Sequence, residues 1–266
     1  PWFDALREVT YDIFILNNIG PFSSYLHYTS NIISSRSPDV IMVTNSAHGY
    51  TMLPYLREAF PSCVFVDYNH MEAMDWNNGG YPRLSATLDA TLDFHFTASK
   101  RLRNLMNDWG VSQKKLSIAH VGIELDKWKP DAIRKAAIRA KLGYNENDKV
   151  ILYSCRFVSQ KQPLLMAHTA MRLLLKIANE NGKPDTMNNV AIKFMIVGDG
   201  PLMQKMKKVL SQLPAKLLDN IRFYDSVHYT DAYDVTLASD ITFLPSVMEG
   251  IPTSFFEAMS VGNVIV

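Results

Sequence analysis

Short apolar stretches alternate with amphipathic, helix-like stretches along the whole of this 266-residue chain. Apolar runs of four to six residues are typical of strands buried on both faces. We predict strands at 11–16, 40–43, 64–67, 94–97, 116–121, 150–154, 194–197, 221–224, 241–244 and 263–266. We predict helices near 21–35, 49–59, 82–91, 99–109, 131–142, 203–213 and 254–262, and another that begins near Pro163. Since alternation of this kind builds βαβ units, the sequence predicts an α/β fold with parallel sheets.

The length allows one large domain or two ordinary ones. We place a first Rossmann-like domain at 1–128 and a second at 129–266, divided at the turn that follows the strand near 116–121. The chain opens on Pro1 without methionine and ends inside the apolar run 263–266. We therefore expect a piece of a longer protein, with both domains incomplete at the chain ends.

Charge and composition exclude several classes of protein. A net charge of +1, with basic residues scattered along the chain, argues against nucleic-acid binding. No apolar run approaches the roughly 18 residues of a membrane helix, and the first 20 residues lack a signal-peptide layout. The basic helix 131–142 has a thin apolar stripe, so we interpret it as a solvated face rather than a membrane anchor.

Two cysteines, Cys63 and Cys155, and the lack of any N-x-S/T sequon lean towards a cytoplasmic protein. Two cysteines are too few for a disulfide framework or a four-cysteine metal site. Peripheral contact with a membrane surface and an organellar address stay open.

The stretch from 243 to 262 has the features of an anion-binding corner. Pro245 ends the strand before it, and Gly250 lets a ligand approach the backbone. The sequence Ser254 to Glu257 has the S-x-x-E pattern of a capping box, which would open a helix whose N–H groups face an anion. Glu257 is explained by capping alone, whereas Glu249 is not, so Glu249 is the better candidate for binding hydroxyl groups beside a phosphate.

A second candidate loop follows the strand at 150–154. Arg156 and Lys161 lie five residues apart in it, so a guanidinium and an ammonium group can converge on one diphosphate. Two solvated surface charges are the simpler alternative. The turn Gly198-Asp199-Gly200 is no dinucleotide-binding fingerprint, because Met203 stands where the third glycine belongs.

These motifs together resemble retaining GT-B glycosyltransferases, specifically glycosyltransferase family 4 (glycosyl transferases group 1). The resemblance rests on the E-x7-E spacing of Glu249 and Glu257, the R-x4-K pattern of Arg156 and Lys161, and a G-D-G-P turn at 198–201. It is strong from residue 150 onward and weak before residue 90. It implies two Rossmann-like domains facing a cleft, with the donor held mainly by the second and the acceptor by the first.

The resemblance also implies an activity. A sugar moves from a nucleoside diphosphate sugar to an acceptor hydroxyl, with retention of anomeric configuration and without a metal ion. Arg156 and Lys161 would stabilise the departing diphosphate, Glu249 would bind the sugar hydroxyls and Glu257 the ribose. His70 is the first-domain candidate for the catalytic centre, with His48 a weaker one. Further donor-binding residues would be Gly198, Gly200, Gly250, Ile251, Pro252 and Thr253.

Some positions depart from the family pattern. Cys155 stands where a glycine usually precedes the arginine, Val121 replaces an asparagine, and Asp225 replaces a glycine. We interpret Cys155 as a small buried residue that narrows the phosphate pocket rather than as a reactive thiol.

Rival functions are a non-catalytic module that binds a nucleotide sugar or acts as a scaffold, and a nucleoside diphosphate sugar epimerase of the same architecture. A phosphorylase would need a pyridoxal-type lysine site, which the sequence does not reveal. We expect no cofactor and no metal, because D-x-D, C-x-x-C and H-E-x-x-H motifs are all missing from the sequence. The expected ligands are a nucleoside diphosphate sugar and an acceptor that is a saccharide, a lipid-linked group or a protein.

Overall fold

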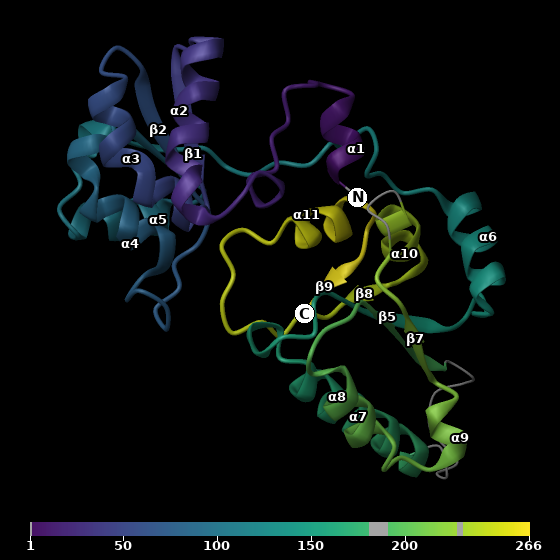
Figure 1. The fold of residues 1–266 in the computed structure, drawn as a ribbon. Helices are drawn as coiled ribbons and strands as arrows, with labels where there is room; N and C mark the ends of the chain where they lie inside the picture. The colour runs from purple at the N-terminus through teal and green to yellow at the C-terminus, as the bar shows by residue number, and fades with distance from the viewer. Residues whose placement is uncertain (1, 181–190, 228–230) are drawn as a thin grey trace. The chain divides into compact units, whose positions relative to one another are not determined.

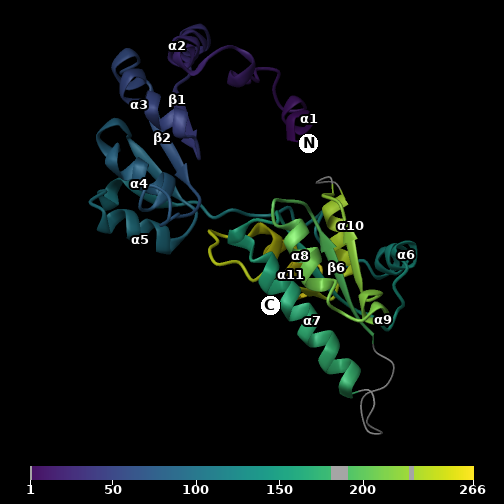
Figure 2. The same ribbon diagram turned by 60° about the horizontal axis from the view of Figure 1, so that its bottom comes forward.

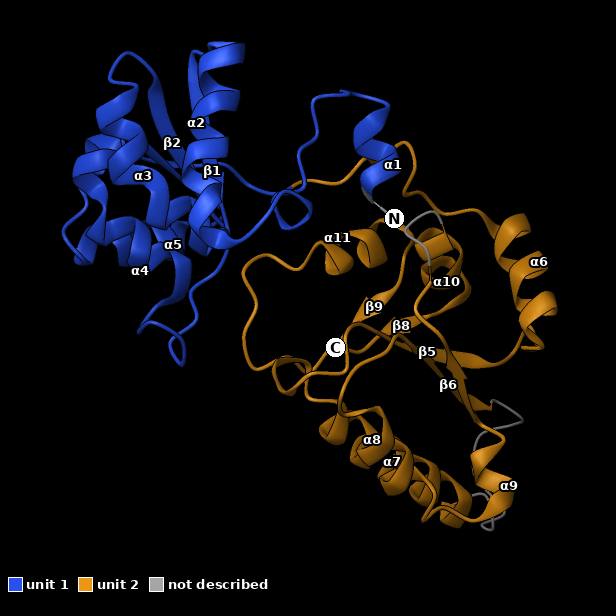
Figure 3. Ribbon diagram, viewed as in Figure 1, with its two compact units in different colours: residues 1–121 blue, residues 122–266 orange. Residues whose placement is uncertain are grey.

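Two parallel sheets organise the chain, one in each of two compact units, residues 1–121 and 122–266 (Figures 1 and 3). The computed structural model describes residues 2–180, 191–227 and 231–266. The units divide between Val121 and Gly122, at the glycine turn that follows the last strand of the first sheet and a few residues before the predicted boundary at 128.

The first unit contains a four-stranded sheet in the order β1-β2-β3-β4, with every pair parallel. The strands are β1 (Val40–Thr44), β2 (Val64–Asn69), β3 (Phe94–Thr97) and β4 (Leu116–Ile118). The helices are α1 (Trp2–Arg7), α2 (Tyr25–Arg36), α3 (Ala47–Ala59), α4 (Gly80–Thr87) and α5 (Lys100–Asp108), with 3-10 turns η1 (Leu16–Asn18), η2 (Phe22–Ser24), η3 (Asp89–Thr91) and η4 (Gln113–Lys115). Because the strands are parallel, their carboxyl ends share one edge of the sheet.

The strand predicted at 11–16 is wrong. This stretch is irregular and ends at η1. Of its apolar side chains, Leu16 packs against the core of the unit, whereas Tyr11 is 92% exposed. Asp12 instead pairs with Arg36 of α2. An apolar run becomes a strand only where a neighbouring strand pairs with its backbone, and none does so here.

The second unit contains a five-stranded parallel sheet in the order β7-β6-β5-β8-β9. The strands are β5 (Lys149–Ser154), β6 (Ile192–Val197), β7 (Ile221–Tyr224), β8 (Ile241–Thr242) and β9 (Val264–Ile265). The helices are α6 (Ala132–Leu142), α7 (Pro163–Glu180), α8 (Met203–Leu210), α9 (Ala215–Leu218), α10 (Ala232–Ala238) and α11 (Thr253–Ser260), with the 3-10 turn η5 (Ser159–Lys161). This order is that of a doubly wound, Rossmann-like sheet.

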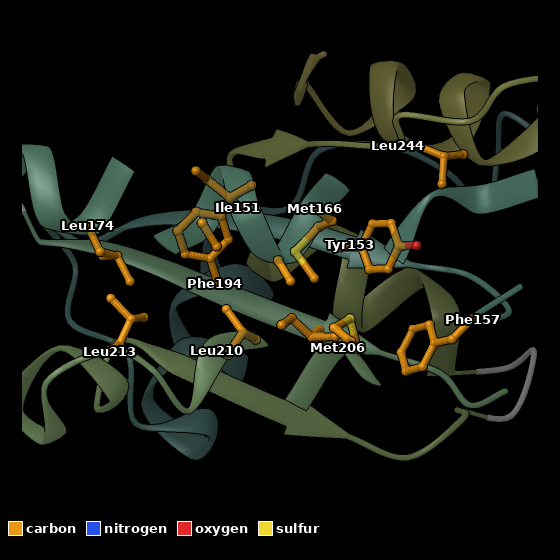
Figure 4. Packing of buried hydrophobic residues seen from close by; sticks show 13 residues of the cluster. Ile151, Tyr153, Phe157, Met166, Leu174, Phe194, Met206, Leu210, Leu213 and Leu244 are labelled. Carbon is orange, nitrogen blue, oxygen red and sulfur yellow. The ribbon is translucent and has the colours of Figure 1, made fainter. Parts of the chain in front are cut away.

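Helices cover both faces of this sheet, as the turned view in Figure 2 shows, with α7 and α8 on one side and α6 and α10 on the other. Side chains alternate along β5, so Ile151 and Tyr153 pack towards α7 and α8 while Val150 and Leu152 pack towards α6 and α10. Figure 4 shows the larger cluster, in which Phe194 of β6 lies among methionine and leucine side chains of the two helices. Burial on both faces explains the nearly continuous apolar strands.

Most residues of the basic helix α6 are exposed, as predicted, but three of its charged side chains face the rest of the unit. Arg134 pairs with Asp234, and both Lys135 and Arg139 pair with Asp240. Arg139 is buried and also donates to backbone carbonyl groups. The charges of α6 therefore attach it to α10 and β8. Within the described part of the chain, no helix is long and apolar enough to cross a membrane.

Candidate functional site

The order of the second sheet reverses at β5, whose neighbours are β6 on one side and β8 on the other. At such a switch point, the loops that leave neighbouring carboxyl ends diverge and open a crevice for a ligand. The loop after β5 (155–162) and the loop after β8 (243–252) both begin there. These are the loops that carry Arg156, Lys161 and Glu249.

Hydrogen bonds join the two loops. The Val247 backbone N–H donates to the Gln160 carbonyl at 2.9 Å, and the Gln160 side chain donates to the Met248 carbonyl at 2.8 Å. Next to these contacts, the Lys161 ammonium group donates to Glu249 Oε1 in an ion pair. The two side chains are only 17% and 21% exposed. Lys161 is therefore no solvated surface charge, and Glu249 has a structural partner that its sequence context does not reveal.

A cavity of about 390 Å³ opens at the carboxyl ends of β5 and β6. It is lined by Ser154, Cys155, Arg156, Val197, Gly198, Asp199, Ser226 and Val227. Its volume is that of a small-molecule pocket. Of the predicted donor-binding residues, Arg156 and Gly198 line it. Asp199, Ser226 and Val227 line it too, although the sequence alone did not mark them as site residues.

The Gly198-Asp199-Gly200 turn packs tightly against the β5 loop. Both glycines have positive φ, at 131° and 156°. A Cβ atom on Gly200 would lie 2.7 Å from the Phe157 backbone, and one on Gly198 would collide with the Cys155 carbonyl. The Phe157 N–H donates to the Asp199 carbonyl at 2.8 Å. Glycine is needed here so that two backbones can approach, and this contact shapes the wall of the cavity.

The predicted capping box at Ser254 and Glu257 is wrong. Helix α11 begins at Thr253, with Pro252 as its N-cap residue and no side-chain capping bond. The N-cap residue is thus two residues before Ser254, so Ser254 lies inside the helix. Glu257 is then too far along the helix to form a capping box. Burial raises the pKa of Glu257 above its usual value, and none of the described residues gives this carboxyl a hydrogen bond or a counter-ion. Glu257 thus loses the structural explanation that capping offered.

The loop that leads into α11 holds the remaining predicted donor-binding residues. Gly250, Ile251, Pro252 and Thr253 follow Glu249 directly and are all partly exposed. In the same loop the Ser246 hydroxyl is buried and has no hydrogen-bond partner among the described residues. A buried polar atom of this kind is uncommon in folded proteins and points to a ligand or a water molecule beside it.

Cys155 lies between Ser154 of β5 and Arg156, and its side chain is partly buried. Burial raises the pKa of the Cys155 thiol to about 11. A thiol with such a pKa is almost wholly protonated at neutral pH and is a poor nucleophile. The position therefore fits a small residue in the cavity wall.

In the first unit, His70 directly follows β2 at the carboxyl edge of the sheet. Its Nε2 atom lies 3.0 Å from the Thr44 hydroxyl, and its ring packs on Tyr68. Burial lowers the pKa of His70, so the neutral imidazole is favoured near pH 7. The weaker candidate, His48, packs its ring against Phe22 and Tyr25.

The sequence profile of the family described as glycosyl transferases group 1 matches residues 134–266, which is half of the chain. The chain belongs to the glycosyl transferases group 1 family. Its two α/β units with parallel sheets are those of the GT-B architecture.

Similar proteins include the UDP-Gal:alpha-D-GlcNAc-diphosphoundecaprenol alpha-1,3-galactosyltransferase of Escherichia coli, which is 33% identical over 153 residues. That match covers 57% of this chain and 36% of the relative. This chain thus spans about a third of the length of that relative.

Two solved structures share the fold. HepE of Anabaena, in complex with UDP-glucose, superposes with a TM-score of 0.66 at 15% identity, over 95% of this chain and 64% of its own. Sucrose-phosphate synthase of Thermosynechococcus elongatus gives a TM-score of 0.68 at 16% identity, over 92% of this chain and 59% of its own.

This glycosyl transferases group 1 chain also contains a buried polar cluster that we did not predict. His95 of β3 is fully buried, with Nδ1 lying 3.0 Å from Asp67 Oδ1 and Nε2 lying 3.0 Å from Asp89 Oδ1. Tyr50 and Asn69 donate to the other oxygen of Asp67. The only signal in the sequence is a polar residue at every second position near the ends of two apolar strands, at 67 and 69 and at 95 and 97.

The two carboxylates beside His95 favour a charged imidazole, although the Ser85 hydroxyl also lies 2.9 Å from Nδ1. A neutral ring would turn a lone pair towards one of the two carboxylates, whereas an imidazolium donates to both. Burial opposes the charge, but the hydrogen bonds and charges of Asp67 and Asp89 outweigh it and raise the pKa of His95. Lys115 then pairs with Asp89 at 3.2 Å. Among the described residues, no group of three or more His, Cys, Asp or Glu side chains is arranged to hold a metal ion.

Proposed function

We propose that this protein transfers a sugar from a nucleoside diphosphate sugar to an acceptor hydroxyl, with retention of anomeric configuration and without a metal ion. Arg156 and Lys161 bind the diphosphate, Glu249 the sugar hydroxyls and Glu257 the ribose. Gly198, Gly200 and the loop 250–253 complete the donor pocket through their backbones. The sugar is a hexose or a related sugar.

The observation that supports the proposal is the meeting of Lys161 and Glu249 at the switch point, where both charges act on Cys155, which lines the cavity together with Arg156. A donor of this class presents a diphosphate beside sugar hydroxyls, so it needs cations and carboxylates in close contact. An ammonium group has three N–H donors, and the ion pair with Glu249 uses one of them. The pair thus retains donors for phosphate oxygens and a carboxylate oxygen for hydroxyls.

The chemistry follows from where charge develops. As the bond between the sugar and the diphosphate breaks, negative charge grows on the departing phosphate oxygens. The Arg156 guanidinium and the Lys161 ammonium group, the second held in place by Glu249, would stabilise this charge more than they stabilise the bound donor, which is the condition for faster transfer. Two protein cations can fill the role that a divalent ion plays elsewhere, so we expect transfer to continue in the presence of a chelator.

Glu257 and His70 complete the proposal. The Glu257 carboxyl lacks a partner among the described residues and lies in the first turns of α11, so it has free acceptor capacity for ribose hydroxyls. The neutral, partly buried His70 imidazole can donate or accept a hydrogen bond near the reacting carbon.

The similar proteins suggest which donors to test first. The Escherichia coli relative is named for UDP-galactose, and the Anabaena structure contains UDP-glucose. For the acceptor we retain a saccharide or a lipid-linked group, the second of which would bring peripheral contact with a membrane.

Calorimetry of the protein with UDP, UDP-glucose, UDP-galactose and UDP-N-acetylglucosamine tests the donor site. We expect saturable binding that Arg156→Ala and Lys161→Ala each weaken, while the exposed control Lys176→Ala leaves it unchanged. Binding that is insensitive to both substitutions would overturn the assignment of the site. Transfer that survives Glu249→Ala undiminished would refute its part in binding the sugar.

Two further measurements separate the finer parts of the proposal. The anomeric configuration of the product, read by NMR from the coupling of its anomeric proton, decides between retention and inversion. Donor binding without any transfer, in the presence of saccharide acceptors, would favour the non-catalytic module over the enzyme.

A further inference from the structure

The loop between β2 and α4 presents an unusual pair of exposed apolar side chains. This loop, residues 70–79, begins with His70 at the carboxyl edge of the first sheet. Met74 is 53% exposed and Trp76 is 40% exposed. Neither side chain belongs to a hydrophobic core cluster of the unit, so core packing does not explain their position.

The backbone of the 70–79 loop has a defined shape. The Trp76 and Gly79 N–H groups both donate to the Ala73 carbonyl at 3.1 Å, and the Gly80 N–H donates to the Trp76 carbonyl at 2.8 Å. The four residues from Asn77 to Gly80 all have positive φ, at 49°, 50°, 137° and 72°. Glycine and asparagine are the residues that adopt this conformation most readily, so the sequence Asn-Asn-Gly-Gly suits this turn.

The Trp76 ring packs against a stack of two tyrosine rings. Its edge contacts Tyr81 with the ring centroids 4.8 Å apart, and Tyr81 stacks on Tyr50 at 6.0 Å. The Tyr50 hydroxyl donates at 2.9 Å to Asp67, which belongs to the buried cluster. The indole is thus connected through Tyr81 and Tyr50 to the buried cluster around Asp67. These contacts hold the Trp76 side chain in one orientation.

Polar groups accompany this apolar surface. Glu72, in the same loop, is buried and accepts from Arg101 at 2.8 and 2.7 Å. The Arg101 side chain, which follows β3 in the first turn of α5, is nevertheless 81% exposed. Because β2 and β3 are neighbours, Arg101 and the 70–79 loop belong to the same edge of the sheet.

An exposed indole, on the same loop as the Glu72 carboxylate that holds an exposed guanidinium, suits a pyranose ring. The C–H face of such a ring is apolar and packs on an aromatic surface, whereas its rim of hydroxyls needs hydrogen-bonding partners. A protein partner would instead favour a contiguous apolar patch of several hundred Å². The combination of one aromatic platform with one paired guanidinium therefore favours a saccharide.

We propose that the 70–79 loop binds the acceptor substrate, and that this substrate is a saccharide whose pyranose ring stacks on Trp76, extends over Met74 and places hydroxyls near Arg101. Only the assignment of this saccharide as the acceptor substrate rests on the proposed function. The binding of a saccharide to this loop requires neither a donor nor turnover.

The test is the binding of the protein to an array of immobilised mono- and oligosaccharides of glucose, galactose, mannose and their N-acetyl derivatives. We expect a subset to bind, Trp76→Ala to weaken that binding about tenfold, and Trp76→Phe to retain most of it. Tyr55→Ala removes an aromatic side chain that is 59% exposed on α3 and should leave binding unchanged.

Met74→Ala is a second test in case Trp76→Ala fails to fold, because it truncates an exposed side chain. It should weaken saccharide binding several-fold. Saccharide binding that is equal in the wild type and Trp76→Ala, or lost equally in Tyr55→Ala, would overturn the proposal. So would a wild-type protein that binds UDP yet no saccharide at millimolar concentration, and that result would leave the donor site standing. Loss of UDP binding together with intact saccharide binding would refute the donor site alone.

Discussion

Both units bring oppositely charged side chains together from neighbouring parallel strands or from the loops that follow them, but they use these side chains differently. In the first unit, Asp67 and His95 are fully buried, and their hydrogen bonds are made within the unit. In the second unit, Lys161 and Glu249 are partly exposed at the switch point of the sheet, and Glu257 has no partner among the described residues.

The difference separates structure from function. Burying charges costs more than their attraction returns unless every donor and acceptor is paired, so a fully paired cluster holds one conformation and has no capacity left for a ligand. A partly exposed pair keeps spare donors and acceptors, and these are what a charged substrate can use. Substitutions in the first cluster should therefore affect folding, and those in the second should affect turnover.

The largest effect is expected from Asp67→Ala. The substitution leaves the buried His95 imidazolium with one carboxylate and deprives Tyr50 and Asn69 of their acceptor. We expect the free energy of unfolding of the first unit to fall by about 3–5 kcal/mol. Hydrogen exchange of β2 and β3 amides measures this, with β5 and β6 amides as the internal control. A loss below about 1 kcal/mol would show that the cluster is not structural.

Lys161→Ala should reverse this pattern. Under the proposed function, its removal takes away a cation that stabilises the departing diphosphate, so turnover should fall by about 10²–10³-fold. Amide exchange in β2 and β3 should stay at the wild-type rate. Lys161→Arg, which retains the charge, should recover part of the activity. Turnover within twofold of the wild type in Lys161→Ala would remove this residue from the mechanism.

The buried cluster should also make the stability of the first unit depend on pH. The folded pKa of His95 is raised, so the stabilisation that its charge provides is complete below the unfolded value of about 6.5 and is lost as pH rises through the folded pKa. The unfolding midpoint of this unit should therefore decrease as the pH rises above about 6.5. His95→Gln should flatten that dependence, and an unchanged slope in this variant would assign the effect to another group.

The smallest effect is expected from Glu257→Gln. Because burial raises the folded pKa of Glu257, the ionised carboxyl destabilises the fold as pH rises through that pKa. The neutral amide should therefore raise the unfolding midpoint of the second unit at pH 7. It should also weaken UDP binding about fivefold, because an amide oxygen is a poorer acceptor than a carboxylate. Weaker stability with unchanged binding would make Glu257 a structural residue.

Most of the fold could be predicted from the sequence, because buried strands and amphipathic helices leave local patterns. Nine of the ten predicted strands exist, and the exception at 11–16 has the apolar residues of a strand without a neighbour to pair with. The capping box failed for a related reason. The S-x-x-E pattern is local, whereas the start of α11 is decided by Pro252, which already supplies the φ angle of a helix entry.

The sequence by itself determined that this chain builds doubly wound parallel sheets and that Arg156, Lys161 and Glu249 lie in loops at strand ends, since hydrophobic periodicity and turn residues are written locally. Only the tertiary structure decided which of these residues meet. Lys161 reaches Glu249, 88 residues further along the chain, because β5 and β8 became neighbours in the sheet. His95 lies between two carboxylates because β2, β3 and η3 pack together around it. Strand order minimises the free energy of the whole core, so no local stretch of sequence encodes such pairs.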